Sequence, residues 1–406
     1  MPLLPALFLA VPLSAVPPVI DDSDISGGRK VAPSSLNQLQ KEGRQEGRVA
    51  IFPALASPSF PRIPAAENKV SGILRLADGA GVWHPAALAR IQLAGPNAPK
   101  SWVETDGSGR FIVAAGGLEG TYRARFSLDN QFWIFHNPAN RTSYEWETPP
   151  FTLTSGGIDL GNISPIPGSE NAKAGMIHLT YSAAARFLQT EGDVAWWNQP
   201  LTVNWPGTAD FFSPWAWSLD VTNPIAWDVN LHELGHAVMA GAMNAEPASG
   251  QHKIDECYSQ ELAWSEGWAS FLAAAVGLAR DDADAKFEFL VPRRAPIRVE
   301  NVPADVCRGI SNEWRVTAGL WDLFDTNADG RDQFAMPFAL IWKALREKQT
   351  DGFLSGWALI AQQLNPDQRR AAQEGLTQNT LLPERSALPE ALPVTLLSAP
   401  NNWAQR

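Results

Sequence analysis

The segment HELGH, residues 232–236, restricts the fold of this chain more than any other feature of its sequence. Residues four positions apart lie on one face of an α-helix, so His232 and His236 can bind the same cation. Glu233 lies close enough to such a metal to act on a water molecule without coordinating the metal itself. The apolar AVMAGAM that follows disfavours the alternative, two surface histidines on a helix. The segment predicts a buried helix that holds one catalytic zinc ion.

Catalytic zinc takes three protein ligands and leaves one position for water, so a third ligand must come from elsewhere. Ala242 stands where a third histidine of the extended motif would be, which leaves two downstream glutamates. Glu256 has the more usual spacing, but the segment around it, GQHKIDECYSQ, is polar and turn-like. Glu266 lies in LAWSEGWASFLAAA, where the burial of a carboxylate without a compensating charge is costly. We expect Glu266 to be the ligand, with Glu256 as the alternative.

The segment SEGWASF resembles the G-E-G-W-S-D-F segment of fungalysins and the N-E-G-F-A-x-Y/F segment of the aminopeptidase N family. Both belong to the gluzincin metallopeptidases, in which this glutamate is the third zinc ligand. The resemblance implies one zinc ion held by His232, His236 and Glu266, with Glu233 as the general base. Ser270 stands where fungalysins and thermolysins have an aspartate that hydrogen-bonds a ligand histidine, so we expect a weaker partner there.

Further candidates for the site come from the segment EWRVTAGLWDLFD, which resembles the helix after the ligand glutamate in fungalysin-like enzymes. We expect Trp314 and Trp321 to pack beneath the zinc helices. Arg315 and Asp322 are candidates to hold a substrate carbonyl or to orient a histidine.

Gluzincins also use a tyrosine or histidine to stabilise the oxyanion of the reaction. The candidates in this chain are Tyr258, Tyr181, His252 and His178. We prefer Tyr258, which directly precedes the helix of Glu266, and the alternative is a tyrosine that only packs in the core.

The segment DTNADGRD matches the first half of a calcium-binding loop, with Asp325, Asn327 and Asp329 at positions one, three and five. Met336 stands at position twelve, where a bidentate acid is required. The sequence therefore favours an Asx-rich turn without a metal over a calcium site.

Residues 69–165 consist of short alternating runs separated by turn residues, which is typical of an antiparallel β-sandwich. The runs VSGILRL, ARIQL and TDGSGRFIV resemble the carboxypeptidase-regulatory or transthyretin-like sandwich family. This resemblance implies an accessory domain that serves packing or attachment.

Residues 166–385 mix helical and strand patterns and are expected to form the catalytic domain. Helices are predicted from residue 171 to Gly192, around HELGH, at ELAWSEGWASFLAAAVGLAR and at NEWRVTAGLWDLFD. Strands are predicted at QPLTVNWP and at AWSLDVTNP, the second as an edge strand for an extended peptide. The fold class expected is multidomain: an all-β sandwich followed by an α+β, mainly helical gluzincin-type metallopeptidase domain.

Both ends of the chain differ from these domains. Residues 1–20 are apolar and resemble a signal peptide without its usual basic residue, which predicts a secreted or cell-envelope protein. Residues 21–68 read as a linker or propeptide-like segment and 386–406 as a tail. In an exported protein, Cys257 and Cys307 are expected to form one disulfide, and two buried free thiols are the alternative.

Charge and hydropathy exclude two classes of partner. The 43 acidic residues outnumber the 32 basic ones and no basic run occurs, which argues against nucleic acid and anionic membranes. No later segment is apolar enough to span a membrane. The sequence carries no signal for an oligomeric state.

We therefore predict a zinc metalloendopeptidase that acts on peptides or proteins. The rivals are a catalytically degenerate extracellular binding or adhesion module, suggested by Ser270, and an exopeptidase. The exopeptidase is disfavoured because the G-x-M-E-N motif of the aminopeptidases is missing before HELGH.

Overall fold

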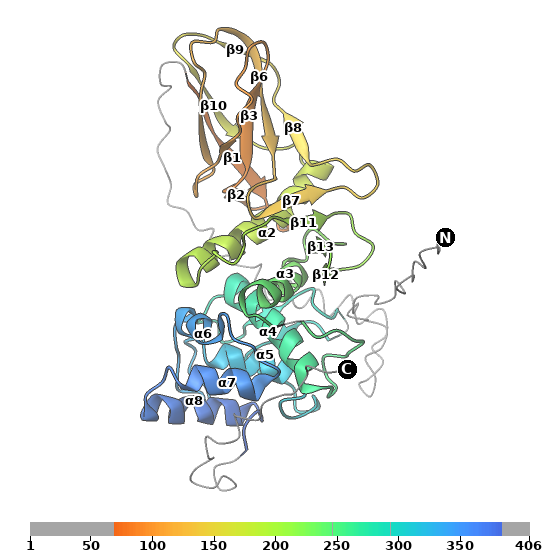
Figure 1. Cartoon of the computed structure of the whole chain (residues 1–406), viewed down its shortest axis with the longest axis vertical. Coiled ribbons are helices and arrows are strands. Elements are labelled where there is room, and N and C mark those ends of the chain that lie inside the picture. Colours follow the sequence, from red (N-terminus) through yellow and green to blue (C-terminus); the bar gives the residue numbers. More distant parts are fainter. Residues whose placement is uncertain (1–68, 246, 293, 384–406) are drawn as a thin grey trace, which may run out of the picture.

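The structure is a computed structural model that describes residues 69–245, 247–292 and 294–383, which form a mixed α/β multidomain fold (Figure 1). The predicted signal peptide, the linker up to residue 68 and the tail from residue 386 lie outside the described residues. The strands lie mainly at one end of the molecule and the helices α4 to α8 at the other, with α2 and α3 between them.

Nine strands of the N-terminal part form two sheets that face each other. One sheet has the order β10-β1-β2 with β5 also paired to β1, and the other has the order β4-β3-β6-β8 with β9 paired to β6. Phe111 and Phe126 pack edge to face between the sheets, 5.6 Å apart. The strands are β1 (Lys69–Ala77), β2 (Trp83–Pro85), β3 (Arg90–Ala94), β4 (Val103–Glu104), β5 (Arg110–Ala114), β6 (Gly120–Ser127), β8 (Glu145–Glu147), β9 (Phe151–Leu153) and β10 (Ile158–Ile163).

Strand β7 (Trp133–His136) departs from the expected sandwich. It pairs in parallel with β11 (Leu201–Asn204), so it belongs to a third sheet with the order β12-β13-β11-β7. The other members are β12 (Phe211–Ser213) and β13 (Ser218–Asp220). Parallel pairing joins segments far apart in the chain, which local alternation does not reveal. A strand from the N-terminal part of the chain therefore belongs to the sheet of the C-terminal part.

The four helices that the sequence predicts, α2 to α5, begin and end close to the expected residues, whereas α6, α7 and α8 were not predicted. Helix α2 (Glu170–Glu191) is capped at its start by the Ser169 side chain and ends at Gly192. The others are α3 (Trp227–Ala242), α4 (Gln260–Gly277), α5 (Glu313–Asp322), α6 (Phe338–Leu345), α7 (Phe353–Ala361) and α8 (Pro366–Gln378), and a short hairpin pairs β14 (Lys286–Phe287) with β15 (Ile297–Arg298). None of the described helices has both the length and the apolarity needed to cross a membrane.

Helix α2 connects the sandwich to the helices below it (Figure 1). His178 of α2 lies 2.8 Å from the Ala87 carbonyl oxygen through Nε2, and the Trp133 indole donates to its Nδ1. Gly175 faces Leu76 of β1. His178, an oxyanion candidate by sequence, is therefore part of this buried contact.

Helices α3, α4 and α5 pack at short range because small residues line their contacts. A Cβ atom on Gly235 of α3 would lie 2.6 Å from the Ala269 Cα of α4. A Cβ on Gly267 of α4 would lie 2.5 Å from a side-chain carbon of Val316 in α5. Both glycines stand next to the residues of interest, Gly235 beside His236 and Gly267 beside Glu266. The glycines let the helix backbones approach and so set the spacing of the site.

Candidate metal centre

The two histidines of HELGH lie on one face of α3, as the helical spacing requires. Their Nε2 atoms are 3.2 Å apart, and His232, Glu233 and His236 are all buried. Asp228 lies in the first turn of α3, where its carboxylate accepts hydrogen bonds from the backbone N–H groups of residues 288–290. Asp228 thus anchors the segment after β14 to the start of α3.

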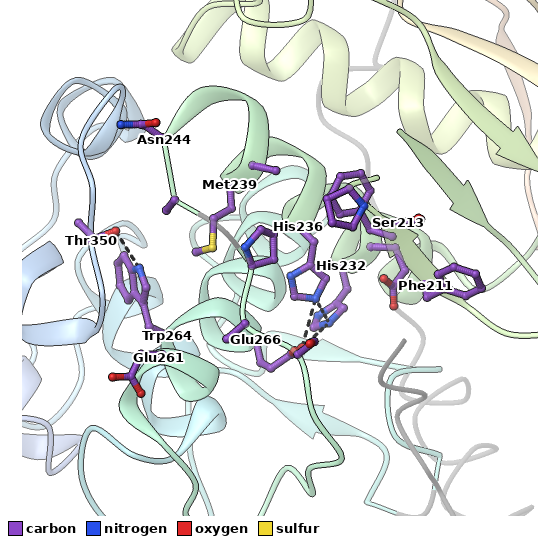
Figure 2. Close-up of a pocket in the computed structure, with 18 of the residues that line it drawn as sticks. Phe211, Ser213, His232, His236, Met239, Asn244, Glu261, Trp264, Glu266 and Thr350 are labelled. Carbon is purple, nitrogen blue, oxygen red and sulfur yellow. Dashed lines mark hydrogen bonds and ion pairs between the residues drawn. The ribbon is translucent and has the colours of Figure 1, made fainter. Parts of the chain in front are cut away.

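The structure places Glu266 of α4 against both histidines (Figure 2). Its Oε2 atom lies 3.0 Å from Nε2 of His232 and 3.2 Å from Nε2 of His236. Glu256 lies elsewhere, on the loop before α4, where its carboxylate contacts Lys253 and Tyr258. The ligand atoms of His232, His236 and Glu266 all lie within 4.8 Å of one another.

These three residues fit a zinc ion. Two imidazole nitrogens and one carboxylate oxygen are the donor set of gluzincin-type catalytic sites. Burial by itself raises the pKa of Glu266, but His236 and His252, together with hydrogen bonds from His232 and His236, hold that pKa well below its ordinary value. The other oxygen of Glu266, Oε1, is buried and has no hydrogen-bond partner. The group therefore keeps acceptor capacity that the protein alone does not satisfy.

Two serines of α4 hold the outer nitrogens of the histidines. Nδ1 of His232 lies 3.0 Å from the Ser270 hydroxyl, and Nδ1 of His236 lies 3.3 Å from the Ser265 hydroxyl. If Nε2 faces a metal, Nδ1 carries the proton and donates to the serine, which fixes the tautomer and the ring orientation. Ser270 was predicted in this role and Ser265 was not. The available signal was that Ser265 directly precedes Glu266 on the same helix.

Glu233 is buried beside this group and lines the same cavity. Burial raises the pKa of Glu233, and the charges of His232 and His236 oppose that rise. A carboxylate with a raised pKa next to a metal site is suited to accept and return a proton.

His252 reaches the site from the loop between α3 and α4. Its Nδ1 lies 2.7 Å from Oε2 of Glu313, and its Nε2 lies 3.8 Å from Oε1 of Glu266. Burial lowers the pKa of His252, but the carboxylates of Glu313 and Glu266 outweigh burial and raise it to about 10. The sequence suggested His252 as an oxyanion candidate, yet it is not among the described residues that line the cavity.

The remaining sequence candidates lie away from the three ligand atoms. The Tyr258 hydroxyl donates to Glu256, and the Arg315 guanidinium donates to the carbonyls of Pro303 and Val306. The Asp322 carboxylate accepts from the Asn379 side chain. None of Tyr258, Arg315 and Asp322 is among the described cavity residues.

Tyr181 of α2 is fully buried, and its hydroxyl has no hydrogen-bond partner. Burial raises the pKa of this phenol well above its ordinary value, and the nearby Glu233 adds to the rise. Tyr181 also lies outside the described lining of the cavity.

The disulfide predicted from the cysteine pair is confirmed. Cys257 and Cys307 are bonded, with their Cα atoms 5.6 Å apart. It joins the loop before α4 to the loop before α5.

The calcium-like segment forms an Asx turn, in which the backbone N–H of Asn327 donates to the Asp325 carboxylate. The Asn327 side chain donates to Glu300, and Asp329 accepts from Gln378. Among the described residues, the groups of histidines and acids that could hold a metal all include Glu266. The structure gives calcium at Asp325, Asn327 and Asp329 no support.

A cavity of about 920 Å³ opens beside the metal centre, with His232, Glu233, His236 and Glu266 in its wall. In Figure 2, Phe211 and Ser213 lie on one side of the histidines, and Trp264 and Thr350 lie on the other. The segment after β12 adds aromatic side chains to the lining, including Trp217 and Trp215, which is 97% exposed.

The edge strand beside the cavity is β12, at the end of the order β12-β13-β11-β7. The predicted edge strand, AWSLDVTNP, contains β13, which is paired on both sides and lies inside the sheet. The prediction was wrong because the antiparallel hairpin with β12 covers β13.

Comparisons with known proteins connect the second half of the chain to peptidases. Residues 190–380 match the family model described as the Mycolysin C-terminal domain. This range includes α3, α4 and α5, and the match supports a thermolysin-like metallopeptidase relationship. A comparison with curated proteins finds no match.

Solved structures show only weak similarity. The 5-hydroxyisourate hydrolase of Klebsiella pneumoniae is 19% identical, with 24% of this chain and 90% of that chain covered and a TM-score of 0.17. A putative carbohydrate binding protein from Pseudomonas aeruginosa is 14% identical, with 27% and 100% covered and a TM-score of 0.17. An (S)-allantoin synthase is 18% identical, with 25% and 43% covered and a TM-score of 0.17. Similarity at this level carries no argument about function.

Proposed function

We propose that this protein is a zinc-dependent endopeptidase. The observation that carries the proposal is the meeting of His232, His236 and Glu266 at the wall of a cavity that also contains Glu233. The match of residues 190–380 to the Mycolysin C-terminal domain supports the same chemistry.

Zn²⁺ held by His232, His236 and Glu266 would supply Lewis acidity, which polarises a peptide carbonyl and lowers the pKa of water. The Glu233 carboxylate removes a proton from the attacking water and then delivers it to the nitrogen of the leaving amine. Ser270 and Ser265 keep the two imidazoles oriented through Nδ1 while this proton moves. The proposed metal ligands, the general base and the serines that orient the imidazoles thus all lie on α3 or α4.

The substrate is an extended peptide or protein segment that lies along β12. As the sheet edge beside the cavity, β12 can pair with the main chain of a peptide without selecting its sequence. The aromatic lining favours large apolar side chains near the cleaved bond. No recognition of a free amino terminus is proposed, since the aminopeptidase motif is missing from the sequence, and this favours internal cleavage.

A degenerate binding protein is the main rival, and Ser270 was the feature that favoured it. In the structure the Ser270 hydroxyl meets Nδ1 of His232 at 3.0 Å, as the aspartate of the related enzymes is expected to do. The substitution therefore keeps a hydrogen bond to the ligand histidine, which weakens the case for loss of activity.

The disulfide between Cys257 and Cys307 supports a role outside the cytoplasm, because such bonds persist in oxidising compartments. We propose secretion or retention in the cell envelope.

The test is hydrolysis of a mixed peptide library by the purified protein, stripped with a chelator and reloaded with Zn²⁺. Mass spectrometry distinguishes internal cuts, terminal trimming and no cleavage. We expect internal cuts that require the metal, and a loss of kcat by about 10³-fold or more in Glu233→Gln with zinc still bound. Full activity of zinc-loaded Glu233→Gln would show that the proposed mechanism is wrong.

A further inference from the structure

Three buried side chains contact one another in sequence up to the candidate metal centre: Glu313, His252 and Glu266. The His252 ring lies between two carboxylates, and each of its nitrogens faces one of them, Nδ1 at 2.7 Å from Glu313 and Nε2 at 3.8 Å from Glu266. The side chains of His252 and Glu266 are each 2% exposed. The contact is to Oε1 of Glu266, whereas Oε2 faces His232 and His236. The two oxygens of one carboxylate thus face different neighbours.

The loop that carries His252 is held in place on α5, the helix of Glu313. The Asn312 side chain, which caps α5, donates to the carbonyls of Ile254 and Glu256 at 2.8 Å each. The disulfide between Cys257 and Cys307 joins the same loop to the segment that precedes α5. A loop that the sequence shows as polar and turn-like is therefore a fixed support for the His252 ring.

Two roles are chemically consistent with this arrangement. His252, Glu266 and Glu313 place ligand atoms within 4.8 Å of one another, which is close enough for a second metal ion that shares Glu266 with the first. Alternatively, His252 holds Oε1 of Glu266 by charge, with Nε2 and Oε1 3.8 Å apart. The second role fits better, because the two carboxylates face different nitrogens of the His252 ring, whereas a metal ion bound by all three residues would need one nitrogen beside both carboxylates.

We propose that His252, held by Glu313, is a positioning residue for Glu266. The His252 ring attracts Oε1 toward itself and leaves Oε2 as the single oxygen that faces the metal beside His232 and His236. A glutamate held in this way keeps one coordination mode and leaves space for water and substrate. This inference rests on the proposed function, because it assumes that Glu266 is a zinc ligand.

The experiment compares four variants of the full chain: His252→Ala, His252→Gln, Glu313→Gln and Glu256→Gln. Glu256→Gln is the matched control, since this glutamate lies on the same loop and its carboxylate points to Lys253 and Tyr258. Zinc affinity is measured by competition with a chromophoric chelator, zinc content by mass spectrometry, and coordination by the visible spectrum of the Co²⁺-loaded protein. Circular dichroism verifies the fold of each variant.

We expect one zinc per chain in the wild type and a loss of zinc affinity of about 10–100-fold in His252→Ala, with a changed Co²⁺ spectrum. His252→Gln, which keeps a donor, and Glu313→Gln, which keeps the volume of the side chain, should lose less in the same direction. Glu256→Gln should match the wild type. If His252→Ala does not fold, the two conservative variants carry the test.

Unchanged affinity and an unchanged Co²⁺ spectrum in the His252 and Glu313 variants would overturn the positioning role while leaving the proposed function intact. Two zinc ions in the wild type and one in His252→Ala would replace it with the second metal site. If the wild type binds no zinc, or cleaves no peptide when loaded, the proposed function itself fails.

Discussion

Gly235 of α3 and Ala269 of α4 lie in backbone contact, so that a Cβ atom on Gly235 would stand 2.6 Å from the Ala269 Cα. No real Cβ contact is that short, and the atom it meets belongs to a backbone that cannot rotate away. The close approach brings the ligand faces of the two helices together. Across this contact, Nε2 of His232 on α3 lies 3.0 Å from Oε2 of Glu266 on α4.

Gly235→Ala is therefore expected to force α3 and α4 apart. Overpacking of a buried contact costs about 1–3 kcal/mol of unfolding free energy, and zinc affinity should fall with it because the ligands separate. Gly156→Ala is the control, since a Cβ there would meet only Thr154 at 3.7 Å. Chemical denaturation and chelator competition measure the two effects. Wild-type zinc affinity in Gly235→Ala would show that the helix contact does not set the site.

Ser270→Ala tests the outer hydrogen bond to His232. Removal of the hydroxyl leaves Nδ1 of a buried imidazole without its acceptor, so we expect about tenfold weaker zinc binding and a lower kcat. Ser182→Ala is a suitable control, because Ser182 is buried but donates to the Ala87 carbonyl in the contact between α2 and the sandwich. Equal zinc affinity in the wild type and Ser270→Ala would contradict the role of Ser270.

The sequence reveals the parts of the site that depend on local periodicity. HELGH lies on a helix because its apolar neighbours recur at helical spacing, and Glu266 stands out because a carboxylate in SEGWASF has apolar residues on nearly every side. Ser265 was not predicted, although it directly precedes Glu266 on α4. The inferences about HELGH and Glu266 each need only the residues within a turn or two of helix.

The missed features depend on contacts between distant segments. His252 lies in a polar loop whose position is fixed by Asn312 and by the disulfide, neither of which gives a local pattern. Strand β7 leaves the sandwich to pair in parallel with β11, and β12 takes the sheet edge that we expected at β13. Pairing partners are not encoded by the alternation within one strand.

Asp325 gives the chain a pH-dependent stability. Burial raises the pKa of Asp325 to about 8, and neighbouring acids add to the rise. A carboxyl whose pKa is raised on folding stabilises the fold at low pH, and this stabilisation is lost as pH rises through the folded value. The charged groups around Asp325 are Glu300, Asp332, Asp329, Asp322 and Arg280.

Asp325→Asn should therefore gain stability relative to the wild type between pH 5 and pH 8.5, by about 1 kcal/mol or more. Asp367→Asn, whose side chain is 91% exposed, should show no such trend. Denaturant titrations at both pH values, without added calcium, provide the measurement. If 2 mM Ca²⁺ instead stabilised the wild type and Asp325→Asn abolished the gain, the loop would be a calcium site after all.

Trp215 offers a test of the substrate side of the cavity. Its side chain is 97% exposed yet lines the cavity beside the metal centre, so a bound peptide would cover it. Trp215→Ala should leave the unfolding free energy within about 0.5 kcal/mol of the wild type, since an exposed side chain adds little to folding.

In Trp215→Ala, we expect KM to rise about 5–20-fold for peptides with a large apolar side chain next to the cleaved bond, because that side chain loses its apolar contact. For peptides with alanine at that position, KM should change little. Trp83→Ala on β2, also exposed, is the control for loss of a surface tryptophan. An equal rise in KM for both peptide classes would mean that Trp215 shapes the cavity without selecting the side chain.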